Sequence, residues 1–83
     1  MNVNVVFSNE GKNILIQANH DDMFAEIVNR YCTKSGITEK DKPKFFVNGK
    51  EIPYTSYQSL SDLQINDNAR IEVVKSGGLV AAF

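Results

Sequence analysis

Two adjacent glycines, Gly77 and Gly78, are the residues whose type and position suggest chemistry most directly. They follow an alternating segment, residues 71–74, and precede five apolar residues, 79–83. Because glycine has no β-carbon, the pair makes a thin, flexible strip of backbone that can thread a narrow enzyme tunnel. There a protease could cut after Gly78, and an activating enzyme could adenylate the new carboxylate. The same dipeptide is also common in ordinary flexible linkers. The rest of the chain must therefore show whether these glycines form a processing site or a linker.

No other residues form a catalytic or metal-binding set. The only cysteine, Cys32, and the only histidine, His20, are separated by about 18 Å if the intervening chain is helical, so they cannot work as a nucleophile and its base. One cysteine and one histidine are also too few for a zinc or iron–sulfur site. The glycines lack the Lys-Ser/Thr and the helix of a phosphate loop. The sequence therefore predicts a protein without enzymatic activity, metal or cofactor.

Length, charge and composition limit the remaining possibilities. The chain has 83 residues, 42% of them hydrophobic, and a formal net charge of −1, which suits one small folded domain. Its lysines are scattered among acids, so nonspecific nucleic-acid binding is not expected. We see neither a signal peptide nor an apolar run long enough for a membrane span. With a single cysteine, these features favour a monomer in a reducing compartment, the cytoplasm or the nucleus.

The first half of the chain reads as a β-hairpin followed by a helix. Apolar residues alternate over residues 3–7 and 14–16, and Gly11 lies in the polar link between these two strands. Asp21 or Asp22 could cap a following helix, which Gly36 would end. One face of that helix carries apolar residues at spacings of three and four, namely Phe24, Ile27, Val28 and Tyr31.

The second half contains three more strands. Residues 44–47 and 50–52 flank Asn48-Gly49, a strong signal for a type I′ turn. A polar connection over 38–43 precedes them, a helical turn over 59–63 follows, and residues 70–73 alternate as the last strand. The first and last strands can pair in parallel if the helix supplies the crossover. The sequence predicts an α+β β-grasp fold, with a mixed four- to five-stranded sheet packed on one α-helix.

At this point the chain resembles ubiquitin and its relatives, the ubiquitin/SUMO-type β-grasp superfamily, over residues 1–78. The hairpin link ends in Gly11-Lys12 and the helix in Gly36-Ile37. The segments 44–50, Lys-Phe-Phe-Val-Asn-Gly-Lys, and 60–65, Leu-Ser-Asp-Leu-Gln-Ile, are similar to the family's middle strand and to its Leu-Ser-Asp-aromatic-x-Ile segment. We expect a ubiquitin-like domain over residues 1–76, followed by Gly-Gly and a short apolar tail over residues 77–83.

The resemblance also implies a partner-binding face on the outside of the sheet. Its middle-strand position falls on Phe46, flanked by Gly49 and Lys50, and its last-strand positions fall on Glu72 and Val74. Period-two alternation independently places Phe46 outside if its two neighbours point to the core. The first hairpin link offers nothing apolar, and Glu72 stands where ubiquitin has histidine. This patch should therefore be smaller and more acidic than that of ubiquitin.

Two functions fit these features, and the sequence favours the first. In the first, the protein is a modifier made as a precursor: a processing protease cuts after Gly78, and activating and conjugating enzymes join it to target lysines. In the second, it is a non-conjugated interaction module that docks through Phe46 and its surroundings and through its tail. Sulfur-carrier proteins share the fold, but their glycines are the true C-terminus. Either function predicts protein partners, including the reader proteins that bind ubiquitin-like domains.

Overall fold

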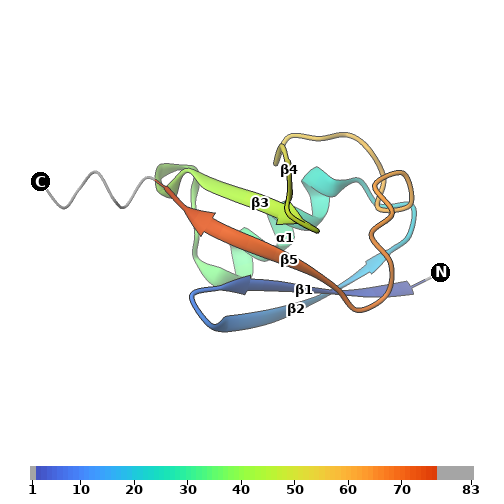
Figure 1. The fold of residues 1–83 in the computed structure, drawn as a ribbon, viewed down its shortest axis with the longest axis horizontal. Helices are drawn as coiled ribbons and strands as arrows, with labels where there is room; N and C mark the ends of the chain where they lie inside the picture. Colours follow the sequence, from blue (N-terminus) through green and yellow to red (C-terminus); the bar gives the residue numbers. More distant parts are fainter. Residues whose placement is uncertain (1, 77–83) are drawn as a thin grey trace, which may run out of the picture.

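The computed structural model describes residues 2–76, which form a five-stranded sheet, one α-helix and one short 3-10 helix (Figure 1). Each strand alternates between buried and more exposed residues over most of its length, as the sequence predicts. In chain order the elements are β1 (Asn2–Asn9), β2 (Lys12–Asn19), α1 (Phe24–Ser35), η1 (Glu39–Asp41), β3 (Pro43–Val47), β4 (Lys50–Ile52) and β5 (Ala69–Lys75).

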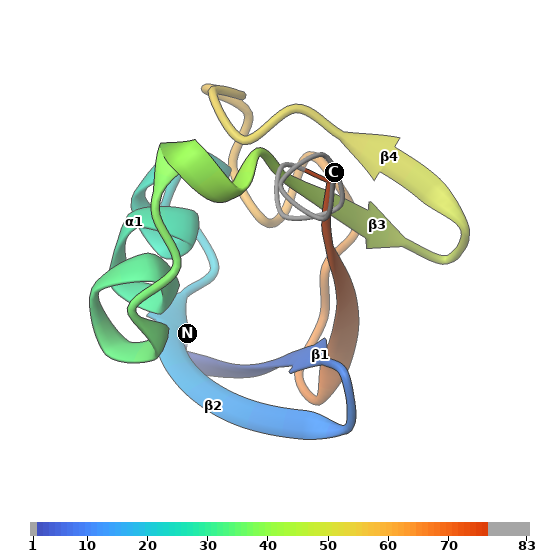
Figure 2. The same ribbon diagram turned by 90° about the vertical axis from the view of Figure 1, so that its left-hand side faces the viewer.

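The sheet has the order β2-β1-β5-β3-β4. Strands β1 and β5 pair in parallel, with Val5 opposite Ala69 and Phe7 opposite Ile71, while the other three pairings are antiparallel. The helix α1 lies on one side of the sheet, and no other helix of residues 2–76 covers the opposite side (Figure 2). This confirms the predicted α+β β-grasp fold with a mixed sheet on one helix, and it settles the number of strands at five.

Each of the two hairpins has a tight turn with glycine as its second central residue. In the β1–β2 link Glu10 has a φ of 51° and Gly11 a φ of 80°. In the β3–β4 link Asn48 has a φ of 52° and Gly49 a φ of 80°. Two successive positive φ angles are what a type I′ turn requires, and its twist matches that of the flanking strands.

The core centres on a cluster of four aromatic rings between the sheet and α1. Phe7 stacks on Tyr31 with ring centroids 4.4 Å apart, and the edge-on ring of Phe45 lies 6.0–6.2 Å from Phe7, Phe24 and Tyr31. All four side chains are almost completely buried. Phe45 therefore connects β3 to both β1 and the helix.

The start of α1 corrects one prediction. Neither Asp21 nor Asp22 caps the helix: the cap position is Met23, which makes no side-chain cap hydrogen bond. Backbone carbonyls from a distant loop accept the free N–H groups at the start of the helix instead. The Gln58 carbonyl accepts from the Phe24 N–H at 2.9 Å, and the Ser56 carbonyl accepts from the Ala25 N–H at 3.1 Å. The Asp22 carboxylate instead accepts from the Asn19 N–H at 2.9 Å.

The end of α1 agrees with the sequence, but the following connection does not. Gly36 is the C-cap with a φ of 81°, and Ile37 is buried behind it. The expected polar connection contains the 3-10 helix η1, held by a capping box between Thr38 and Asp41. Further along the chain, residues 59–63 form the predicted single helical turn, in which the Leu63 N–H donates to the Ser59 carbonyl at 3.1 Å.

Candidate functional site

The outer face of the sheet, opposite α1, is built by alternation along β3 and β5. Phe45 and Val47 are buried, so Phe46 between them turns to the outside, where it is partly exposed. Its cross-strand partners are Glu72 on β5 and Glu51 on β4. The prediction that Phe46 points away from the core agrees with the structure, and the ring has a carboxylate on each side.

Val74 is the second apolar residue on this part of the face. It is 47% exposed and pairs with Lys44, which makes it the diagonal neighbour of Phe46. Diagonal neighbours lie about 7–8 Å apart, within reach of an aromatic side chain. We call Phe46 and Val74, with Lys44, Glu51 and Glu72 around them, the outer patch. It is a small apolar centre with charges of both signs at its rim.

The other two predicted patch residues lie beside the outer patch rather than in it. Gly49 is in the exposed β3–β4 turn, and Lys50 begins β4. Lys50 is the register partner of Val47, which points to the core, so alternation directs it away from the face that Phe46 occupies. Thus the structure brings Phe46, Glu72 and Val74 together and leaves Gly49 and Lys50 at the edge. A binding role for these five residues remains a prediction.

A second exposed apolar spot on the same face was missed from the sequence. Leu15 on β2 is 48% exposed and pairs with Val6 on β1. The signal was available, because Leu15 falls between Ile14 and Ile16, whose predicted inward direction leaves it outside. Arg70 is the other register partner of Val6, and its Nε lies 3.8 Å from the Glu72 carboxylate. This exposed ion pair separates Leu15 and Val6 from the outer patch.

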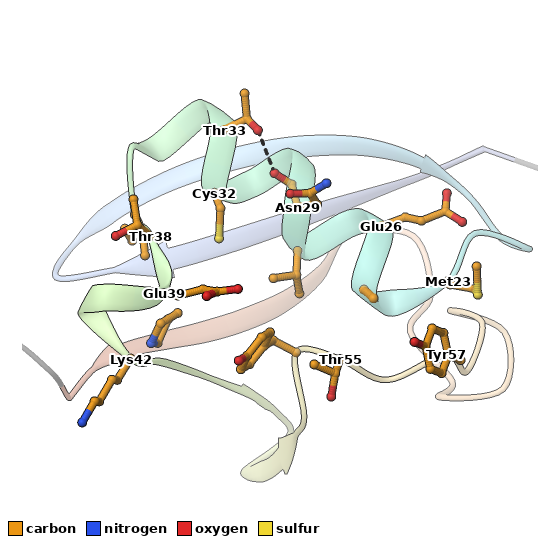
Figure 3. A pocket seen from close by; sticks show the side chains of 15 residues that line it. Met23, Glu26, Asn29, Cys32, Thr33, Thr38, Glu39, Lys42, Thr55 and Tyr57 are labelled. Atoms are coloured by element: carbon orange, nitrogen blue, oxygen red, sulfur yellow. Dashed lines mark hydrogen bonds between the residues drawn. The ribbon is translucent and has the colours of Figure 1, made fainter.

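A groove on the helix side of the sheet is a second candidate site. It has a volume of about 710 Å³ and runs between α1, η1 and the loop of residues 53–58 (Figure 3). Tyr57 in that loop is 81% exposed. The sequence gave no sign of a groove. The apolar or sulfur-containing residues that line it are Met23, Ala25, Val28, Cys32, Ile37, Pro43, Tyr54 and Tyr57.

The loop that forms one wall of the groove is fixed in place by hydrogen bonds. The loop is fixed to the start of α1 by the two carbonyls that cap the helix, and Ser56 closes a turn on Pro53 at 3.0 Å. The Cys32 thiol faces the groove from α1, and burial, assisted by the nearby negative charge of Asp41, raises its pKa. A protonated thiol is a poor nucleophile, so Cys32 serves as part of an apolar wall.

A smaller hollow of about 340 Å³ adjoins the groove at the end of β5. Ser76 lines it, and both the Ser76 N–H and its hydroxyl donate to the Lys42 carbonyl, at 3.3 and 2.8 Å. Lys42 and Pro43 line both hollows. The predicted conjugation site, Gly77 and Gly78, lies outside the described residues.

The described part of the chain shows two further negative findings. Over residues 2–76 no group of three or more histidine, cysteine, aspartate or glutamate side chains could hold a metal ion. Over the same residues no helix is both long enough and apolar enough to cross a membrane.

The five-stranded sheet, its parallel central pair and the single covering helix define a ubiquitin-like β-grasp domain. The family model described as ubiquitin-2 like Rad60 SUMO-like matches residues 1–74. The chain therefore belongs to this family of SUMO-like domains. No curated protein matches the sequence.

Solved structures show the same fold at low sequence identity. The ubiquitin-like domain of yeast Ddi1 is 15% identical with a TM-score of 0.80, and the match covers 90% of both chains. A ubiquitin-like domain from Arabidopsis thaliana is 14% identical with a TM-score of 0.77, over 89% of this chain and 77% of that one. A chain in the crystal structure of ATBAG1 in complex with HSP70 is 15% identical with a TM-score of 0.77, over 96% of this chain. This chain spans only 45% of that larger protein chain.

Proposed function

We propose that this domain is a non-conjugated protein-interaction module that binds partner proteins through the outer patch. The observation that carries the proposal is the position of Ser76. Its two hydrogen bonds to the Lys42 carbonyl hold the chain against the domain immediately before Gly77. In this proposal the role of the domain is to present a shaped surface to another protein.

The chemistry of the outer patch suits a protein partner. Exposed Val74 beside the Phe46 ring gives a hydrophobic centre, and aromatic side chains are enriched among the residues that dominate binding energy. The surrounding Lys44, Glu51 and Glu72 can pair with charges on a partner. Among proteins of similar fold, ATBAG1 forms a complex with HSP70. We infer the same general kind of activity here.

Conjugation through Gly78 is the second candidate, and the Gly77-Gly78 pair one residue beyond the end of β5 is the observation that favours it. The sequence alone put this function first. We place it second here, because only two residues, about 7 Å of extended chain, separate Ser76 from the end of Gly78. Threading Gly78 into an activating enzyme would require Ser76 to leave Lys42 first.

The test is affinity capture with a matched pair of variants. The wild-type chain, Phe46→Asp and Leu15→Asp would be immobilised and exposed to lysate from the native cells, with bound proteins identified by mass spectrometry. Both variants place a carboxylate at an outward position of the same sheet face. We expect Phe46→Asp to lose the partners that wild type and Leu15→Asp retain. Equal recovery on all three proteins would contradict the outer patch as the binding site.

A further inference from the structure

The groove between α1, η1 and the loop of residues 53–58 follows α1 over its whole length. Met23, which precedes the helix, and Ile37, which follows it, both line the groove. The helix has 12 residues and is therefore about 18 Å long. The groove is long enough to receive about three turns of a helix from another protein.

The groove presents apolar and sulfur-containing side chains that the described residues leave partly open. Met23 is 36%, Tyr54 45% and Tyr57 81% exposed. Figure 3 shows Met23 and Tyr57 at one end of this space and Cys32 further along α1. Thioether, thiol and tyrosine side chains pack well against aliphatic and aromatic groups, so the groove suits a partner with several apolar side chains.

Little backbone is available in the groove for a partner to pair with. Of the described residues that line it, only Pro43 belongs to a strand, and proline has no N–H to donate. In the adjoining loop the Ser56 and Gln58 carbonyls already accept from the start of α1. A partner segment buried here must therefore satisfy its own backbone hydrogen bonds, which a helix does and an extended strand does not.

One end of the groove carries a carboxylate that can bind a positive charge. Glu39 lines the groove at η1, and Figure 3 shows its carboxylate pointing into this space while the Lys42 ammonium points away from it. The ion pairs within the described part of the chain do not involve Glu39. Asp41 adds negative charge nearby, since it helps to raise the pKa of the Cys32 thiol in the groove wall. A lysine or arginine on the partner would complement this end of the groove.

We propose that the groove binds an amphipathic helix of another protein, through apolar residues spaced three and four apart and a lysine or arginine that pairs with Glu39. This proposal goes beyond the binding role of the outer patch, because the groove lies on the helix side of the sheet and the outer patch on the opposite side (Figure 2). A helix bound in the groove leaves the outer patch open, so the domain can hold two proteins at once.

The test uses a library of random twelve-residue peptides displayed on phage and panned against the 83-residue chain. We expect the enriched peptides to share a lysine or arginine at a fixed distance from apolar residues spaced three and four apart. A synthetic copy of the most enriched peptide should gain helical circular dichroism on binding. It should shift the backbone amide NMR signals of the groove residues Val28, Cys32 and Thr55 and leave those of Phe46 and Val74 unchanged.

Charge reversal at Glu39 tests the proposed ion pair. Glu39→Lys should weaken binding of this peptide about tenfold, and replacing the basic residue of the peptide by glutamate should restore it. Glu10→Lys is the matched control, because Glu10 is also an exposed glutamate, in the β1–β2 turn away from the groove, and this change should leave the affinity unaltered. Phe46→Asp should also bind the peptide as the wild type does, so this test and the test of the outer patch fail independently.

Several results would overturn the proposal. Panning that enriches no peptide would do so, as would enriched peptides that lack a basic residue, bind without becoming helical, or shift the signals of Phe46 and Val74 instead. Equal affinity of the basic peptide for the wild type and for Glu39→Lys would remove the ion pair. Groove signals that shift with the concentration of the chain alone would show that a second copy of the chain occupies the groove.

Discussion

Replacing Phe45 by alanine should remove a large part of the domain's stability, whereas the same change at Phe46 should hardly affect it. Phe45 is completely buried and its ring meets those of Phe7, Phe24 and Tyr31 at 6.0–6.2 Å. Removing a buried phenylalanine side chain costs about 3–5 kcal/mol. A domain of 83 residues has a total stability of about 4–12 kcal/mol, so this loss is a large part of it.

Urea unfolding followed by far-UV circular dichroism measures both changes. With a slope of about 1.2 kcal/mol/M, Phe45→Ala should lower the midpoint by about 2.5–4 M. Phe46 is partly exposed on the outer face, so Phe46→Ala should cost at most about 1 kcal/mol. Phe45→Leu serves as a milder variant, with an expected loss of about 1–1.5 kcal/mol, if the alanine variant does not fold. Similar midpoints for Phe45→Ala and Phe46→Ala would refute the register of β3.

Three further changes test other parts of the structure. Gly36→Ala should destabilise the domain by about 1–2 kcal/mol in urea unfolding, because its φ of 81° is left-handed although no atom crowds the new β-carbon; an unchanged midpoint would contradict the left-handed cap. Asp22→Ala should lower the free energy of unfolding by about 1–2 kcal/mol in the same assay, because it removes the acceptor for the Asn19 N–H and the 3.2 Å ion pair with Arg30. Asp22→Asn keeps an oxygen acceptor but removes the charge. An equal loss in Asp22→Asn would show that the ion pair, and not the hydrogen bond to Asn19, provides the stability. Burial raises the pKa of the Cys32 thiol in the folded domain, so the unfolded chain loses the thiol proton at a lower pH than the folded one. The free energy of unfolding should therefore fall as the pH rises from the ordinary thiol pKa toward the higher pKa of the folded state. Urea unfolding between neutral and alkaline pH should show this decrease for the wild type and a smaller decrease for Cys32→Ala.

The parts of the fold that were predictable are those that local pattern determines. Alternation located the strands, Gly36 marked the end of α1, and Asn48 with Gly49 set the β3–β4 turn, because each depends on residues adjacent in sequence. The cap at Met23 was not predictable in this way. Its hydrogen-bond acceptors come from Ser56 and Gln58, which only the tertiary fold brings to the helix.

The candidate sites show the same division. Alternation placed Phe46 on the outer face and could equally have placed Leu15 there. The groove has no such signal, because it exists only where α1, η1 and the loop of residues 53–58 come together. The bonds between Ser76 and Lys42 join residues thirty-four positions apart and likewise have no local signature.

The most direct test of the proposed non-conjugated role is the mass of this protein purified from its native cells. Intact and peptide mass spectrometry would show whether residues 79–83 remain attached to Gly78. We predict that the chain retains these residues and that no larger form carries Gly78 in an isopeptide bond to a lysine. A chain that ends at Gly78, found together with such lysine-linked forms, would contradict the account and establish the protein as a modifier.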